Sequence, residues 1–165
     1  MQDEDCHSVR VLDAAEEDAI ARVADGMRRT LMEVLGEERG ATLYTREWLE
    51  DRVRQHLDCR IARARVLLAE AAGAYTGHCI VRVDADEDGR EIGLFSTTWV
   101  EPEWRRRGIA HSLLSAGEAW MLSEGMSIAV TYTAHDNLRL HRLYEAHGYA
   151  IAARTGEFVR LERAL

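Results

Sequence analysis

The segment VEPEWRRRGIA, residues 100–110, joins an apolar run to a helical pattern and decides the expected fold. The apolar run covers residues 92–100 and stops at Pro102, the only proline of the chain. Residues 109–123 carry apolar side chains at helical spacing. Three arginines and Gly108 lie between these two stretches. The segment therefore predicts a strand, a tight basic turn and the N-terminus of a helix.

A turn of this kind is suited to binding phosphate. A helix N-terminus offers backbone N–H groups without partners and the positive end of the helix dipole. Gly108 can adopt a positive φ, and the small side chain of Ala110 lets the backbone approach a diphosphate closely. The arginines add positive charge and forked hydrogen-bond donors. The alternative is a strand–turn–helix connection that happens to be basic, because glycine-bearing turns before helices are common.

Length and composition favour one domain over residues 1–165. The 165 residues are 47% hydrophobic and 30% charged, which is the balance of an ordinary globular protein. The net charge of −8 disfavours nucleic acid and anionic membranes as partners, and three adjacent arginines make a poor nucleic-acid patch on such a protein. Cys6, Cys59 and Cys79 are too scattered for a disulfide framework or a zinc knuckle. The acidic N-terminus, residues 1–5, does not resemble a secretory signal, so a cytoplasmic location is expected.

The periodicity of apolar residues and the turn signals predict the other elements. Strands are expected at residues 8–12, 66–70, 75–83, 91–100 and 127–133, and in a final hairpin of residues 149–153 and 157–161. Helices are expected from residues 13–18 to residue 35, before a break at Gly36 and Gly40, and at residues 45–57, 109–123 and 137–147. Asp136 is expected to cap the last helix. This order predicts a mixed sheet with helices on its faces.

The segment NLRLHRLYEAHGY, residues 137–149, is the second informative stretch. Asn137 lies at the mouth of the predicted helix, and Tyr144 follows two helical turns later on the same face. An amide and a phenol on one stripe could hold an amide-bearing ligand and deliver a proton. The alternative is a helix cap followed by a core tyrosine.

Together the two segments resemble the GNAT family of N-acetyltransferases. Its first signature is V-x-P-x-(aromatic)-R-x-(R/Q)-G-(I/V)-(G/A), and residues 100–110 fill every key position. Its second, after the next strand, is N-x-x-A-x-x-L-Y-x-x-x-G-(F/Y). Residues 137–149 match it, except that Leu140 replaces the usual alanine and adds bulk beside the path of the pantetheine. The first strand and helix also resemble the opening of the family, so the resemblance covers essentially the whole chain.

The resemblance implies an α/β GNAT fold with acetyl-CoA as co-substrate and no metal. The expected sheet is mixed and mostly antiparallel, has six to seven strands, splays between the fourth and fifth strands, and is flanked by about four helices. The basic turn would wrap the pyrophosphate, and pantetheine would pair with the backbone near Val100. The implied acetyl-CoA contacts are Trp99, Val100, Arg105, Arg106, Arg107, Gly108, Ile109, Ala110, His111, Asn137, Leu140 and Tyr144.

The resemblance also implies direct attack of an amine on the thioester in a ternary complex. Tyr144 would be the general acid that protonates the departing thiolate. The amine must first lose a proton, because an alkyl ammonium has a pKa of about 10. Several relatives carry a glutamate for this step where the present chain has Leu94, which cannot serve. Glu91 is the remaining candidate for the general base, and a solvated turn glutamate is the alternative.

The acceptor is less constrained. An acidic protein attracts cations, which favours a small cationic amine as a small-molecule acceptor. The alternatives are a protein N-terminus or lysine, or a non-catalytic acyl-CoA-binding regulatory domain, which the missing glutamate would allow. No metal site is expected, because His135, His141 and His147 do not share one helix face. The C-terminal hairpin could support a homodimer.

Overall fold

The computed structural model describes residues 6–165. Residues 1–5, on which the expectation about a secretory signal rests, lie outside the described part. The strands are β1 (His7–Val11), β2 (Ala64–Ala71), β3 (Ala74–Ala85), β4 (Glu91–Val100), β5 (Ile128–Ala134), β6 (Ala150–Thr155) and β7 (Phe158–Ala164). The helices are α1 (Glu17–Leu35), α2 (Glu37–Thr42), α3 (Arg46–Leu57), α4 (Ile109–Ser123), α5 (Leu138–Ala146) and a short 3₁₀ helix η1 (Pro102–Trp104).

The seven strands form one sheet in the order β1-β2-β3-β4-β5-β7-β6. Neighbouring strands are antiparallel except β4 and β5, which are parallel. A parallel pair needs a crossover connection, and α4 supplies it. This arrangement confirms the predicted fold class.

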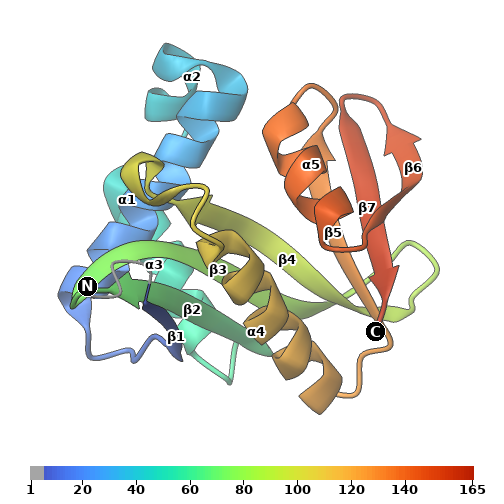
Figure 1. The fold of residues 1–165 in the computed structure, drawn as a ribbon, viewed down its shortest axis with the longest axis horizontal. Helices are drawn as coiled ribbons and strands as arrows, with labels where there is room; N and C mark the ends of the chain where they lie inside the picture. Colours follow the sequence, from blue (N-terminus) through green and yellow to red (C-terminus); the bar gives the residue numbers. More distant parts are fainter. Residues whose placement is uncertain (1–5) are drawn as a thin grey trace.

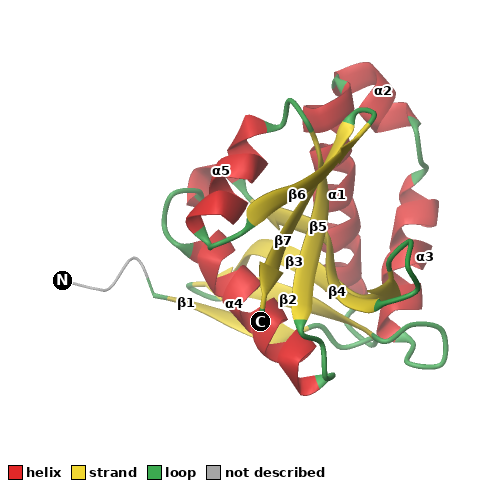
Figure 2. Ribbon diagram, turned by 90° about the vertical axis from the view of Figure 1, so that its right-hand side faces the viewer, coloured by secondary structure: helices red, strands yellow, loops and turns green. Residues whose placement is uncertain are grey.

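Helices cover both faces of the sheet (Figure 2). On one face, α1 and α3 bury Ile20, Val23, Leu49 and Val53 against β2 and β3. On the other face, α4 and α5 enclose a larger core around Phe95 together with apolar residues of the sheet. The sheet therefore separates two cores, and a strand that lines both can present side chains to two different environments.

The sheet opens between β4 and β5. The two strands pair only where residues 93–95 lie beside residues 129–131, although β4 continues to Val100. Beyond that point they diverge (Figure 1). On its other edge β4 stays paired with β3, where Ile80 lies opposite Thr97 and Val81 opposite Phe95, so that Ser96 is an extra residue. Such a bulge changes which face the following side chains point to.

Two details differ from the prediction. Asn137, not Asp136, caps α5, because its Oδ1 accepts a hydrogen bond from the Leu140 N–H (3.3 Å). Gly40 does not interrupt the helical region but lies inside α2, a helix that the periodicity did not reveal. A Cβ on Gly40 would clash with the backbone nitrogen of Met32, so glycine lets α2 pack onto α1.

Among the helices of residues 6–165, none combines the length and apolar character that crossing a membrane requires.

Candidate active site

A pocket of about 640 Å³ lies where β4, the turn after it, α4 and α5 meet. It is lined by Thr98, Val100, Trp104, Arg105, Arg106, Gly108, Ile109, Ala110, His111, Arg139, Leu140, Arg142, Leu143 and Ala146. We refer to it as the large pocket. Most of the residues that the sequence predicted as acetyl-CoA contacts are in this lining.

The basic turn forms the end of the large pocket next to α4. Gly108 is the N-cap of α4, with a φ of 79°, and Arg106 also has a positive φ, of 67°. A positive φ is uncommon for a residue other than glycine and often marks a functional turn. The first N–H groups of α4 have no partner inside the helix, so they are available to an anion. The turn thus has the backbone geometry of an anion site.

Four predicted contacts lie outside the lining. Trp99 is buried between the Arg29 and Arg105 guanidinium groups, each 4.8 Å from the centre of its ring. Arg107 stacks on the Trp104 ring at 4.9 Å.

Asn137 and Tyr144 are the other two, and both follow the alternatives left open by the sequence. Asn137 caps α5 with its side chain. Tyr144 is only 1% exposed and lies in the core. In this structure Asn137 therefore acts as a helix cap and Tyr144 as a core residue. Neither role excludes contact with a ligand.

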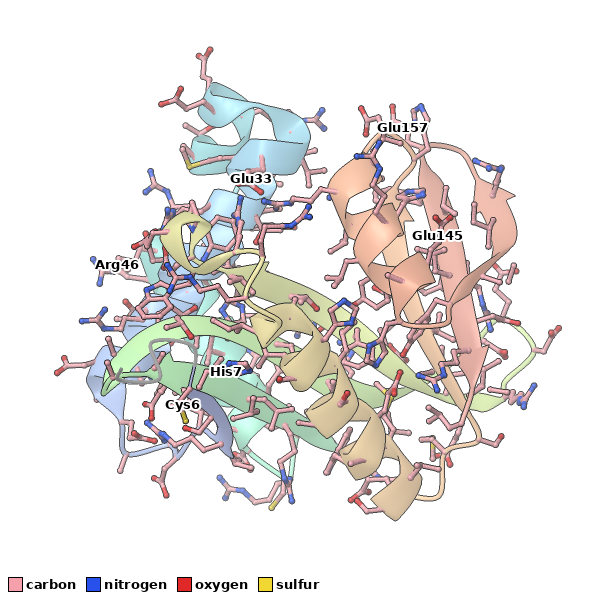
Figure 3. The ribbon with its side chains drawn as sticks, viewed as in Figure 1. Cys6, His7, Glu33, Arg46, Glu145 and Glu157 are labelled. Atoms are coloured by element: carbon pink, nitrogen blue, oxygen red, sulfur yellow. The ribbon has the colours of Figure 1, made fainter. Side chains whose placement is uncertain are left out.

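Glu33 bridges two arginines of the large-pocket lining. From α1 it forms ion pairs with Arg105 of the turn (3.1 Å) and with Arg139 of α5. Figure 3 labels Glu33 on the helix that faces α5. Two arginines that would meet an anionic ligand therefore share one carboxylate as their counter-ion.

His111 is joined to a second polar group near the large pocket. Its Nδ1 lies 3.0 Å from the Nδ1 of His147, so one of these two nitrogens carries a proton. His147 in turn lies 3.4 Å from Glu118. In the described residues, no group of three or more His, Cys, Asp or Glu side chains is arranged to hold a metal ion.

Tyr144 approaches the large pocket through Thr98. The two hydroxyl oxygens are 3.1 Å apart, and Thr98 is part of the pocket lining. The ring is held edge-on by Phe95 and Tyr149, at 5.9 and 5.0 Å between ring centres. Burial raises the pKa of Tyr144, so the phenol is protonated at neutral pH. The protonated hydroxyl therefore lies one hydrogen bond from the pocket.

Glu91 lies far from this arrangement. It is the first residue of β4, it is exposed, and it forms an ion pair with Arg63 (3.1 Å). It belongs to the lining of neither pocket described here. Leu94 packs in a small apolar cluster with Ile92, Ile128 and Val130. The strand that precedes the turn thus brings no carboxylate to the open end of β4.

A second pocket, of about 260 Å³, lies between α1, α3 and the strands β3 and β4. It is lined by Met27, Thr30, Leu31, Tyr44, Trp48, Leu49, Arg52, His56, Ile80, Arg82, Ser96 and Thr97. We refer to it as the small pocket. Ser96 and Thr97 line the small pocket, whereas Thr98 and Val100 line the large one, so one short segment of β4 borders both.

His56 carries no local sequence signal that predicts a site. This side chain, in the last turn of α3, is 5% exposed, and its Nδ1 lies 2.7 Å from the Arg52 carbonyl oxygen. A carbonyl oxygen only accepts, so Nδ1 carries the proton and Nε2 keeps a free lone pair in the neutral ring. Burial lowers the pKa of His56, and the nearby Arg52 and Arg82 guanidinium groups lower it further. His56 is therefore neutral at pH 7.

Comparisons with known proteins agree with this architecture. The chain matches the acetyltransferase (GNAT) family over residues 28–149. The mycothiol acetyltransferase of Thermobispora bispora is 33% identical over 103 residues, which are 61% of this chain and 35% of that protein. The chain thus spans about a third of the length of this curated relative.

Solved structures show the same fold at low identity. The PaiA N-acetyltransferase from Thermoplasma acidophilum, in complex with coenzyme A, has a TM-score of 0.80 at 16% identity and covers 97% of this chain and 99% of its own. An aminoglycoside N-acetyltransferase in complex with CoA has a TM-score of 0.75 at 17% identity and covers 92% of each chain. With its open sheet, its basic turn and these matches, the chain belongs to the acetyltransferase (GNAT) family.

Proposed function

We propose that this protein transfers the acetyl group of acetyl-CoA to a primary amine. One observation carries the proposal: the two pockets lie on opposite sides of the same segment of β4, next to the opening between β4 and β5. Acetyl-CoA enters the large pocket and the amine enters the small pocket. The two reactants meet at residues 96–98, where the bulge redirects the strand.

The large pocket suits the parts of acetyl-CoA. The diphosphate binds the N–H groups at the start of α4, and Arg106 adds positive charge beside them. Arg142, and Arg139 once it exchanges its partner Glu33, bind the remaining phosphate from the α5 side of the pocket. The pantetheine arm runs between β4 and α5, beside Leu140 and Leu143. Its amide groups pair with the free edge of β4 near Val100.

The transfer step is a direct displacement. The lone pair of the amine nitrogen forms the new C–N bond, the C–S bond breaks, and its electron pair leaves with the sulfur. An acceptor that arrives as an ammonium ion loses two protons in total, of which one ends on the CoA thiol and the other in solvent. The Thr98 hydroxyl gives its proton to the thiolate and takes one from Tyr144, and the Tyr144 phenolate then regains a proton that originates in solvent.

A small-molecule acceptor fits the volume of the small pocket. About 260 Å³ is below the usual range of 300–1,000 Å³ for ligand pockets. The name of the mycothiol acetyltransferases also indicates a small acceptor for those proteins. A small cationic amine, expected from the net charge, is not favoured by the pocket itself, because its lining contains two arginines and no carboxylate. The single domain and the homodimer stay predictions.

Thiol release in the presence of an amine panel tests the proposal. We expect one acetyl-CoA to bind with a Kd of tens of micromolar or below by isothermal titration, and thiol to appear only when a suitable amine is added. Absence of acetyl-CoA binding would contradict the proposal outright. Binding without thiol release from any amine would instead support the non-catalytic acyl-CoA-binding alternative.

A further inference from the structure

The small pocket has a charge pattern that the proposed reaction alone does not explain. Its charged side chains are Arg52 and Arg82, and its titratable imidazole is His56. Arg52 makes no ion pair within the described part of the chain, and its Nη1 donates only to the Gln55 side chain (3.1 Å). Arg82 forms an ion pair through Nη2 with the Asp84 carboxylate, which is not part of the pocket lining (2.8 Å), while its buried Nε has no hydrogen-bond partner. An excess of positive charge in a half-enclosed pocket indicates an anionic ligand.

We propose that the acceptor amine carries a carboxylate, which binds between Arg52 and Arg82 while its amino group faces Ser96 and Thr97. The inference rests on the proposed function, because it names the class of acceptor for the same reaction. A guanidinium group presents two parallel donors that match the two oxygens of a carboxylate. The acceptor class is therefore an amino acid or a compact amino-carboxylate, and not a polyamine.

The geometry of the pocket supports this orientation. The arginines come from α3 and β3, whereas the bulge of β4 supplies Ser96 and Thr97 next to the thioester side. The hydroxyl of Thr97 is buried without a hydrogen-bond partner, so it is available to the amino group. The Tyr44 and Trp48 rings, stacked at 4.1 Å, form an apolar wall for the rest of the acceptor.

The arginines also favour the reactive form of the amine. A positive charge close to an ammonium group lowers its pKa, because like charges repel. The bound amine therefore loses its proton more readily than it does in water. The carboxylate compensates for the arginines, so the acceptor as a whole still binds well.

Matched acids and amides test the proposal directly. We expect free L-amino acids to be acetylated with a kcat/KM, calculated on the free-amine concentration, at least about tenfold higher than their carboxamides, which have a similar size but no negative charge. Arg52→Gln should raise the KM for the acid about tenfold to thirtyfold and reduce the acid-to-amide ratio to about two or less. Arg46→Gln is the matched control, since Arg46 is on the same helix but exposed, and it should keep the wild-type ratio.

The possible results separate this inference from the proposed function. Equal or better turnover of amides, or a preference for spermidine, would overturn the inference while leaving the acetyltransferase intact. Absence of turnover with every amine would instead count against the proposed function. If Arg52→Gln does not fold, Arg82→Gln gives an independent reading of the same ratio, and an unchanged ratio there would also overturn the inference.

A different observation, the hydrogen bond that fixes the tautomer of His56, carries a second inference. We infer that His56 accepts the proton of the bound ammonium group through Nε2. The Nδ1–H donates a hydrogen bond to the Arg52 carbonyl oxygen, so the lone pair on Nε2 points away from that carbonyl. The charged groups that face the imidazole are Arg52 on α3 and Arg82 on β3; the lining from α1 and β4 adds only uncharged side chains.

The proton transfer leaves His56 as imidazolium and the acceptor as a neutral amine with a lone pair. Attack then proceeds as described above, and the imidazolium returns its proton to solvent. Because the two guanidinium groups destabilise both the ammonium ion and the imidazolium, the proton leaves the pocket after each turnover. His56 thus fills the role that neither Leu94 nor Glu91 can fill.

The pH dependence of a His56→Gln variant tests this role. At pH 7 we expect kcat/KM to fall at least about tenfold, because the free amine is scarce. At pH 9.5 the free amine is abundant, and wild type and variant should agree within about threefold. His135→Gln, a change at an exposed histidine outside both pockets, should match wild type throughout. A deficit that is the same at all pH values would indicate a structural role and overturn the inference, as would an unchanged rate.

Discussion

Tyr144→Phe is expected to lower turnover about a hundredfold and to leave the affinity for acetyl-CoA nearly unchanged. The hydroxyl is protonated because burial raises its pKa, and it lies one hydrogen bond from the large pocket. The ring remains in place through its contacts with Phe95 and Tyr149, so the pocket keeps its shape. Steady-state thiol release and isothermal titration measure the two quantities separately.

The matched control is Tyr132→Phe, which removes the same atom from an exposed tyrosine outside both pockets. It should keep wild-type turnover. If Tyr144→Phe also kept wild-type turnover, Tyr144 would be a core residue only, and water would have to protonate the thiolate. A parallel loss of acetyl-CoA affinity would show that the hydroxyl shapes the pocket and does not supply the proton.

Ala110→Glu is expected to weaken acetyl-CoA binding about a hundredfold or more, because it brings a carboxylate to the anion site. Ala110 lies in the first turn of α4 and lines the large pocket. An acidic residue in the first turn of a helix interacts favourably with the helix dipole. The melting temperature should therefore be equal to or above that of wild type, although binding is lost.

Ser115→Glu adds the same charge to an exposed position in the middle of α4 and serves as the control. It should bind acetyl-CoA with nearly wild-type affinity. Isothermal titration of both variants, with thermal melts, gives the comparison. Nearly unchanged binding by Ala110→Glu would mean that the diphosphate does not lie at the start of α4, and the assignment of the large pocket would fail.

The sequence predicted the parts of the fold whose signals are local. The bounds of β4 and α4 follow from a mostly apolar run, one proline and a glycine with a positive φ, so they agree with the structure. Residues of the large pocket were predictable for the same reason, since most of them belong to two short segments. The bulge at Ser96 was not predictable, because it arises from the register between β3 and β4 and not from the residue itself.

The small pocket could not be predicted from local sequence signals, because its lining comes from several elements. Its charged lining combines Arg52 and His56 of α3 with Arg82 of β3, and only the packing of the helix on the sheet brings them together. The net charge of −8 favoured a cationic acceptor. The charged side chains that line the small pocket are arginines, so the charge there is positive. A global sum of charges does not describe the field inside a pocket.

Glu33 has a consequence for how the protein responds to salt. Glu33 already forms ion pairs with Arg105 and Arg139. When a nucleotide binds these two arginines, they exchange one anionic partner for another. The net gain in electrostatic attraction is then smaller than the number of arginines implies, and affinity should decline only gently as ionic strength rises. Met27, Thr30 and Leu31, on the same helix as Glu33, form a wall of the small pocket. Displacement of that carboxylate therefore removes a contact of α1, the helix on which the proposed acceptor site is partly built.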